Sequence, residues 1–236
     1  MRRFVLFVVL VTSIAGAQAP EPALAKGVDL LEQGRTSLDE GKLAAARAYF
    51  ADLAEKDSNN FADWYALARV QAYQVEAFVQ HNKKKDAERA LDDAIASVQR
   101  AISINDKSAD AHSLLADLYG RKTSIGGGFM AGAKFGPKSD SENKKALAID
   151  PQNPRVHASL GRQYLHAPRM FGGDVDKAIA QLKQATELDP KSDENFVWLS
   201  VAYRKKGDTA AADKALQEAL RLNPQSQLAL NADKIK

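Results

Sequence analysis

The chain has 236 residues, of which 45% are hydrophobic and 27% are charged. This composition is typical of one folded domain or two small ones, and it excludes a chain that is disordered throughout. The sequence contains no cysteine. That excludes disulfides, thiolate metal sites, a cysteine nucleophile and a lipid-modified N-terminal cysteine.

Residues 1–17 predict a secretory signal peptide. Arg2 and Arg3 give a short positive start, an apolar run covers residues 4–11, and small residues follow. We expect cleavage after Ala17, because the competing Ala-x-Ala site two residues later is followed directly by a proline. An uncleaved anchor is the alternative, although the apolar run is much shorter than the ~20 residues that span a membrane.

Loss of the signal peptide changes the charge. The whole chain carries a formal charge of +3 from 33 basic and 30 acidic residues, so removing the two arginines leaves +1. A nearly neutral chain gives little support to a nucleic-acid partner, and we expect none. We expect the mature protein in the periplasm of a bacterium or secreted, without a membrane span, and with residues 18–26 as a flexible lead.

A repeated sequence motif extends over the rest of the chain. Five similar segments end in an Asp or Asn, and these residues are 48, 45, 39 and 34 positions apart: Asp57, Asn105, Asp150, Asp189 and Asn223. Proline follows three of them, which ends one helix and sets the turn into the next. Internal repeats of this length predict a stack of similar helical units.

The last repeat, residues 193–226, has the clearest pattern. Large residues flank the small Ser200 in its first half, Gly207 lies at the turn, and small and apolar residues return in its second half. With its 34-residue period, the chain closely resembles the tetratricopeptide repeat (TPR) family from about residue 27 to 226. The resemblance implies an all-α, right-handed superhelical solenoid of about five helix-turn-helix hairpins. A generic helical bundle is the alternative.

The repeats fall at about 27–60, 61–108, 109–153, 154–192 and 193–226, with a C-terminal capping helix in 227–236. Small residues recur in pairs where the two helices of a hairpin should cross closely. These pairs are Gly34 with Ala46, Ala68 with Ala94, Gly161 with Ala178, and Ser200 with Ala212.

Repeats two to four carry about 14, 11 and 5 residues beyond 34. The second insert keeps a helix-forming composition and should lengthen both helices. The third, residues 120–139, is rich in glycine. It forms either a loop folded against the concave face or a bend within a long helix. The fourth, residues 166–174, should be a compact turn with Asp174 as the N-cap of the next helix.

The segments Gly136-Pro-Lys-Ser139, Asp150-Pro-Gln-Asn-Pro-Arg155 and Phe171-Gly-Gly173 resemble a subgroup of secreted bacterial TPR proteins with GPKS, DPxNPR and FGG motifs. Over about 60 residues the chain also resembles the periplasmic TPR subunit associated with tripartite (TRAP) transporters. That resemblance implies a transporter or envelope complex as partner. The group is typically lipid-anchored through a cysteine, which this chain lacks.

Catalytic and cofactor motifs are missing from the sequence. The four histidines form no zinc-binding pattern, and no nucleophile elbow occurs. Ala133 separates Gly132 from Lys134 and so breaks a phosphate-binding loop. We expect no metal, no cofactor and no enzyme activity. His112 and His157 should pack between hairpins, and His81 and His166 should be exposed in loops.

The family resemblance implies that the first helix of each repeat lines the concave face. The side chains at the lining positions are mostly basic: Arg35, Tyr65, Arg69, Tyr73, Asp117, Arg121, Arg155, Arg162, Arg204 and Lys205. Arginine binds carboxylates through two parallel hydrogen bonds, so the groove would favour acidic peptides or chain termini. The family's carboxylate-clamp pattern of Lys and Asn is absent. A solvated groove with intramolecular ion pairs is the alternative.

The sequence therefore predicts non-enzymatic binding of a protein or peptide in the concave groove. The alternative is a small-solute or lipid-binding accessory subunit of a transporter. In that reading the Gly-rich insert and the Phe171-Gly172-Gly173 turn close a pocket, with Phe129, Met130, Phe135 and Phe171 as its lining or lid. A hydrolase site within the inserts is a third reading, but no nucleophile–base pair supports it.

Overall fold

The computed structural model describes residues 22–126 and 128–235. The expected signal peptide, residues 1–17, and residues 18–21 of the expected lead lie outside this range. The first helix begins at Pro22, so the remainder of the expected lead, up to residue 26, is already helical. Within the described residues the regular secondary structure is entirely helical, as the all-α prediction requires.

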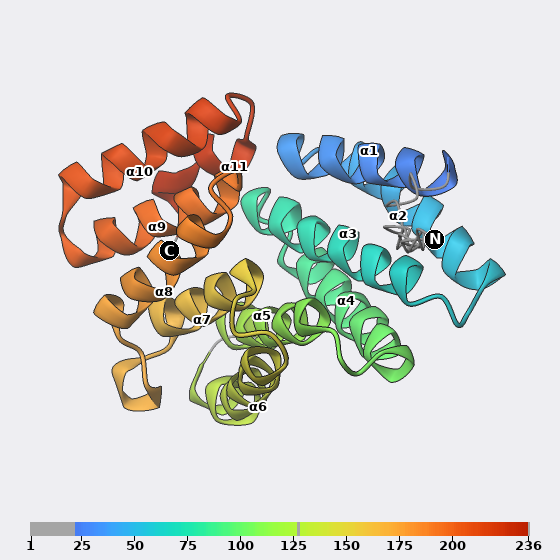
Figure 1. Ribbon diagram of the computed structural model, residues 1–236, viewed down its shortest axis with the longest axis horizontal. Coiled ribbons are helices and arrows are strands. Elements are labelled where there is room, and N and C mark those ends of the chain that lie inside the picture. Colours follow the sequence, from blue (N-terminus) through green and yellow to red (C-terminus); the bar gives the residue numbers. More distant parts are fainter. Residues whose placement is uncertain (1–21, 127, 236) are drawn as a thin grey trace, which may run out of the picture.

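Ten long helices, counted over the described residues, follow one another and pack against their chain neighbours (Figure 1). They are α1 (Pro22–Ser37), α2 (Glu40–Lys56), α3 (Phe61–Gln80), α4 (Lys84–Ile104), α5 (Ala109–Gly126), α6 (Gly128–Ile149), α7 (Pro154–His166), α8 (Val175–Leu188), α9 (Asp193–Lys206) and α10 (Thr209–Leu222). A 3₁₀ turn, η1 (Arg169–Phe171), precedes α8, and α11 (Gln227–Leu230) and η2 (Ala232–Lys234) close the array.

Local sequence signals set the helix ends. Helices α3, α5, α7 and α9 start at residues 61, 109, 154 and 193, where the sequence predicts new repeats. Asn153 caps α7 by accepting the amide of Arg155, and Asp174 caps α8 by accepting the amides of Asp176 and Lys177, so the Asp174 prediction is confirmed. Gly207 ends α9 with a φ of 89°, a left-handed conformation that glycine adopts without strain.

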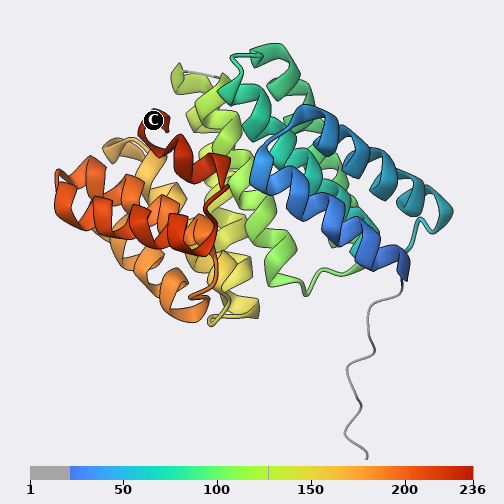
Figure 2. The same cartoon turned by 90° about the horizontal axis from the view of Figure 1, so that it is seen from above.

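The odd-numbered helices form one layer of the array. Helix α3 packs on α1 and α5, while α7 packs on α5 and α9. Helices α2, α4, α6 and α8 each pack against the odd-numbered helices before and after them, and α10 packs against α9, which is the arrangement of an α-solenoid. Helix α1 also contacts α11, so the first and last parts of the described chain meet, as Figures 1 and 2 show from two sides. The right-handed twist of the superhelix stays a prediction.

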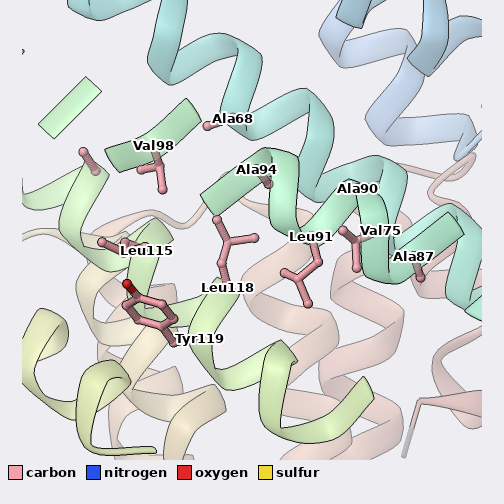
Figure 3. Packing of buried hydrophobic residues seen from close by; sticks show 11 residues of the cluster. Ala68, Val75, Ala87, Ala90, Leu91, Ala94, Val98, Leu115, Leu118 and Tyr119 are labelled. Atoms are coloured by element: carbon pink, nitrogen blue, oxygen red, sulfur yellow. The ribbon is translucent and has the colours of Figure 1, made fainter. Parts of the chain in front are cut away.

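Apolar side chains of three consecutive helices form the largest core. Leu91 of α4 lies between Val75 of α3 and Leu118 of α5 (Figure 3), Val98 of α4 belongs to the same cluster, and all four side chains are completely buried. Burying a side chain of this size contributes about 1.5–3 kcal/mol. A hairpin alone leaves such a face exposed, so neighbouring repeats stabilise one another.

Close helix crossings explain the pairs of small residues. A Cβ atom on Gly161 of α7 would lie 2.5 Å from Cγ of Leu182 in α8. A Cβ on Gly34 of α1 would lie 2.7 Å from Cδ2 of Leu43 in α2. Real Cβ atoms do not approach neighbours this closely, so these crossings require glycine.

The inserts extend helices. The second insert makes α3 and α4 helices of 20 and 21 residues. In the third, α5 runs to Gly126 and α6 begins at Gly128, with Pro137 inside it, so the described part of this insert is helical rather than the alternative loop. No helix in residues 22–126 and 128–235 has the length and apolar character needed to cross a membrane.

Polar residues replace the usual apolar ones in α6. Ser139 is buried and donates its hydroxyl to the carbonyl of Ala116 at 2.9 Å. Asn143 is fully buried and donates its amide to Oε1 of Gln163 at 2.6 Å. These hydrogen bonds hold α6 to α5 and α7 where the family pattern expects apolar contacts.

Candidate ligand-binding surface on the odd-numbered helices

The predicted concave residues converge on a network of ion pairs. Arg35 of α1 donates from Nη1 to Oδ1 of Asp193 in α9 at 2.8 Å. Tyr73 of α3 donates its hydroxyl to Oε2 of Glu194 in α9 at 3.2 Å. Helix α9 of the last hairpin therefore contacts the first two hairpins through polar groups.

Two further arginines complete the centre of this network. Arg121 of α5 donates to Oε2 of Glu76 in α3 at 2.8 Å. Arg162 of α7 donates from Nε to Oδ1 of Asp117 in α5 at 3.1 Å, and its Nη1 lies 4.0 Å from Glu194. The Arg162 guanidinium also lies 5.6 Å from the ring centroid of Trp198, within the range of a cation–π contact. Glu76, Asp117 and Glu194 each come from a helix other than that of the arginine they meet.

The edge of the network is more open. Arg155 of α7 donates to Oδ2 of Asp110 in α5 at 2.5 Å, and half of its side chain is exposed. Tyr65 of α3 lies near Arg155 and Arg69, and the positive charges of both arginines act on its hydroxyl group. Among the described residues Arg69 forms no ion pair, in contrast to the other arginines of the network.

Burial and charge work against each other here. Burial would raise the pKa of Glu194, but Arg162, Arg35 and Arg121 lower it below its usual value, so the carboxylate stays ionised. Burial and the negative charge of Glu194 raise the pKa of Tyr73, which stays a neutral donor. The network is thus a set of charged arginines that already hold carboxylates.

Little empty space remains inside the network. A cavity of about 20 Å³ lies among Arg35, Tyr73, Glu76, Arg121, Glu194 and Trp198. This volume holds about one water molecule. A ligand with an acidic group must therefore displace an internal carboxylate or bind at the open edge, near Arg69 and Arg155.

The remaining two predicted groove residues lie apart from the network. One guanidinium nitrogen of Arg204, Nη1, is buried and has no hydrogen-bond partner in the described structure. Lys205 donates its ammonium to the backbone carbonyl of Leu165. Both line a second pocket of about 230 Å³, together with His166.

His166 differs from the prediction. We expect it to be exposed in a loop, but it is half-buried at the end of α7, edge-on to Trp198 with ring centroids 5.5 Å apart. Burial, followed by the charges of Lys205 and Arg121, lowers its pKa to about 4, so the imidazole is neutral near pH 7. Packing of the C-terminal segment over α7 and α9 buries this residue, which loop composition does not indicate.

The predicted pocket or lid residues are brought together only in part. Phe129 and Phe171 touch, with ring centroids 5.6 Å apart, so the third and fourth inserts meet. Both rings are nevertheless exposed, as is Met130 with 80% of its surface accessible. Phe135 instead stacks on Tyr119 at 6.0 Å. Neither of the two pockets above is lined by these four residues.

His112 and His157 have the same structural role in successive repeats. Each is buried, and each places Nε2 within 3.0 Å of the carbonyl oxygen six residues earlier, at Asp106 and Pro151. The other ring nitrogen meets a side chain of the following helix, Glu142 for His112 and Gln181 for His157. Both histidines are therefore buried packing residues, but these hydrogen bonds reach the preceding turn and the second helix of the same hairpin. In the part of the chain described, no cluster of three or more metal-ligating side chains occurs.

The predicted groove residues include one acidic partner, Asp117, but not Glu76, Asp110, Asp193 or Glu194. Asp110 and Glu194 stand at the second position of their repeats, the same offset that selects Arg155 as a groove residue. His166 and Lys205 share the offset of Arg121. Position within the repeat therefore identifies these residues as lining residues, and the lining residues so identified are acidic as well as basic.

The helical hairpins and the layer of odd-numbered helices define a helical-repeat protein of the α-solenoid class. Residues 172–232, which include α8 to α11, match the family model of the tetratricopeptide repeat. The match supports the TPR family on the segment with the clearest repeat pattern.

Solved structures have the same fold. The thermophilic TPR protein TTC0263 of Thermus thermophilus is 20% identical, with a TM-score of 0.64 over 92% of this chain and 98% of its own. The HusA haemophore of Porphyromonas gingivalis is 16% identical, with a TM-score of 0.60 over 91% of this chain and 98% of its own. No curated protein sequence matches the chain. At these identities the structural neighbours establish the fold alone. TPR proteins typically bind proteins or peptides and are generally not enzymes.

Proposed function

We propose that this chain is an exported, non-catalytic TPR protein that binds an acidic segment of a protein or peptide partner on its concave face. The observation that carries the proposal is the convergence of arginines from α1, α3, α5 and α7 on one surface. Four of them already hold carboxylates of other helices at hydrogen-bonding distance. The surface is therefore preorganised for carboxylate groups, which arginine binds with a planar fork of donors.

The open edge of the network is the entrance for the ligand. Arg69 has no ion pair among the described residues, and Arg155, which shares the neighbour Tyr65 with it, is half exposed. An incoming carboxylate binds Arg69 without displacing an internal carboxylate. A second acidic residue of the ligand then competes with Asp110 for Arg155.

The test uses a fluorescently labelled octaglutamate peptide and fluorescence anisotropy. We expect saturable binding that weakens with added salt, because exposed charges are screened. Arg69→Gln should weaken binding about tenfold or more, since it removes a charge-assisted hydrogen bond. Arg47→Gln is the matched control, because Arg47 is an exposed arginine of α2 that pairs with Asp93 outside the network.

Equal binding of octaglutamate by both variants would contradict the proposal, as would equal binding of an octalysine peptide. Charge reversal at Arg162 is unsuitable, because a glutamate beside Asp117 and Glu194 would destabilise the fold. Export to the periplasm is part of the same proposal and is supported by the N-terminal sequence pattern.

A further inference from the structure

The pocket at the C-terminal end of the array lies outside the arginine network. It is formed by the last residues of α7, by α9 and by the C-terminal segment that covers them, through Leu165, Val201, Ala232 and Ile235. Its volume is about 230 Å³. Because a water molecule takes up about 30 Å³ in the liquid, this space accommodates about eight non-hydrogen atoms.

One wall of this pocket is positively charged and lacks an acidic partner. Arg204 and Lys205 line it, no aspartate or glutamate does, and within the described residues neither cation has an ion pair. Nη1 of Arg204 is buried without a hydrogen-bond acceptor. A buried, unpaired donor of a charged group is costly, so an acceptor that reaches Arg204 gains the free energy of satisfying it.

The other walls are apolar. Leu165, Val201 and Ala232 are buried side chains, and Ile235 packs against the same core. His166 adds a ring whose low pKa keeps it uncharged near neutral pH, so the positive charge is confined to Arg204 and Lys205. A cationic end and an apolar body are the complement of an amphiphilic anion.

We propose that this pocket binds a small carboxylate with a short apolar tail, the carboxylate on Arg204 and the tail among Leu165, Val201 and Ile235. The site is separate from the peptide surface. Trp198 lines the small cavity of the arginine network, and His166, which packs on Trp198, lines this pocket. The pair of rings stands between the two sites.

The experiment is an NMR titration of the full chain, labelled with ¹⁵N, with hexanoate, which has eight non-hydrogen atoms. Hexylammonium is the matched ligand with the opposite charge. We expect saturable amide shifts near residues 163–167, 201–206 and 230–235, with a dissociation constant of roughly 1 mM for so small a ligand. Hexylammonium should produce no saturable shifts there.

Three substitutions test the cationic wall of the pocket. Arg204→Gln should weaken hexanoate binding about tenfold or more, because it removes the cationic donor. Lys206→Gln removes a charge from the same helix, but Lys206 pairs with Asp176 outside the pocket. The affinity of the Lys206→Gln variant for hexanoate should therefore stay within about twofold of that of the unaltered chain. Lys205→Gln is a second pocket variant that reports on the site if Arg204→Gln does not fold.

The proposal is overturned if hexylammonium binds as tightly as hexanoate. It is also overturned if the folded pocket variants retain full affinity, or if no saturable shifts occur in these segments up to roughly 50 mM, far above the expected constant.

Discussion

Arg35 and Asp193 are 158 residues apart in the chain, yet Nη1 of the arginine lies 2.8 Å from Oδ1 of the aspartate. Asn223, which follows α10, donates to Oδ2 of the same aspartate at 3.1 Å and lies 3.4 Å from the Thr36 hydroxyl. These bonds join the first hairpin to the last. A solenoid held only by neighbouring repeats would leave its two ends apart, so the described array is closed by polar contacts.

Asp193→Asn tests the polar closure between the first and last hairpins, because asparagine keeps the shape of the side chain and removes its negative charge. It leaves the largely buried Arg35 with Glu32 as its remaining ionic partner. We expect a loss of about 1.5–3 kcal/mol in the free energy of unfolding, measured by urea denaturation, because the buried guanidinium of Arg35 loses one of its two ionic partners. Asp93→Asn, in the exposed pair with Arg47, should cost about 0–1 kcal/mol. Equal losses in both variants would contradict the importance of the closure.

Gly161 and Gly120 should respond in opposite ways to the same substitution. Gly161→Ala places a Cβ 2.5 Å from Leu182 and should destabilise the protein by about 1–3 kcal/mol. Gly120 lies within α5, where a new Cβ meets only Oγ of Ser139 at 4.0 Å. Gly120→Ala should therefore stabilise by up to about 1 kcal/mol through helix propensity. Thermal unfolding followed by circular dichroism measures both, and a stabilising Gly161→Ala would show that the crossing of α7 and α8 is looser than described.

The helix boundaries follow from signals that are local in sequence. Asn153 and Asp174 are capping residues directly before helices, and Gly207 is a terminating glycine, so each marks a boundary without knowledge of the fold. The repeat register likewise places Arg35 and Arg162 on the layer of odd-numbered helices. These features are predictable because each depends on a few neighbouring residues.

Other features depend on how the ends of the array come together. The partner of Arg35 is in the last hairpin, and no spacing within a repeat indicates a contact over 158 residues. The burial of His166 requires the C-terminal segment to fold back over α7 and α9, which an isolated repeat does not encode. Composition groups Phe129 and Phe171 as lid residues, but their exposure is set by where α6 and η1 lie.

His166 should make the stability depend on pH. Its pKa is about 4 in the folded protein, against an ordinary value of 6.5, because of burial and then the charges of Lys205, Arg121 and Arg162. Between pH 6.5 and 4 the unfolded chain binds a proton that the folded chain does not. Its contribution to stability is therefore complete above pH 6.5 and decreases as the pH falls, by up to about 1.4 kcal/mol per pH unit.

Urea denaturation between about pH 7 and pH 5 measures this slope. His166→Gln should flatten it, because glutamine does not titrate. An unchanged slope in the His166 variant would show that another group titrates in this range.

The predicted signal peptide has a direct test. Expressed in a Gram-negative host, the chain should appear in the periplasmic fraction with an N-terminus at Gln18, because cleavage is expected after Ala17. Intact-mass spectrometry of the purified protein gives the cleavage site. A chain that retains residues 1–17 and sediments with membranes would support the uncleaved anchor instead.

The most direct test of carboxylate recognition follows the arginines themselves. In an NMR titration with octaglutamate, the side-chain Nε–Hε signals of Arg69 and Arg155 should shift first and saturate, and those of Arg47 and Arg221 on α2 and α10 should stay in place. Shifts confined to Arg47 and Arg221, or no saturable shifts of any arginine, would contradict a ligand-binding role for the layer of odd-numbered helices.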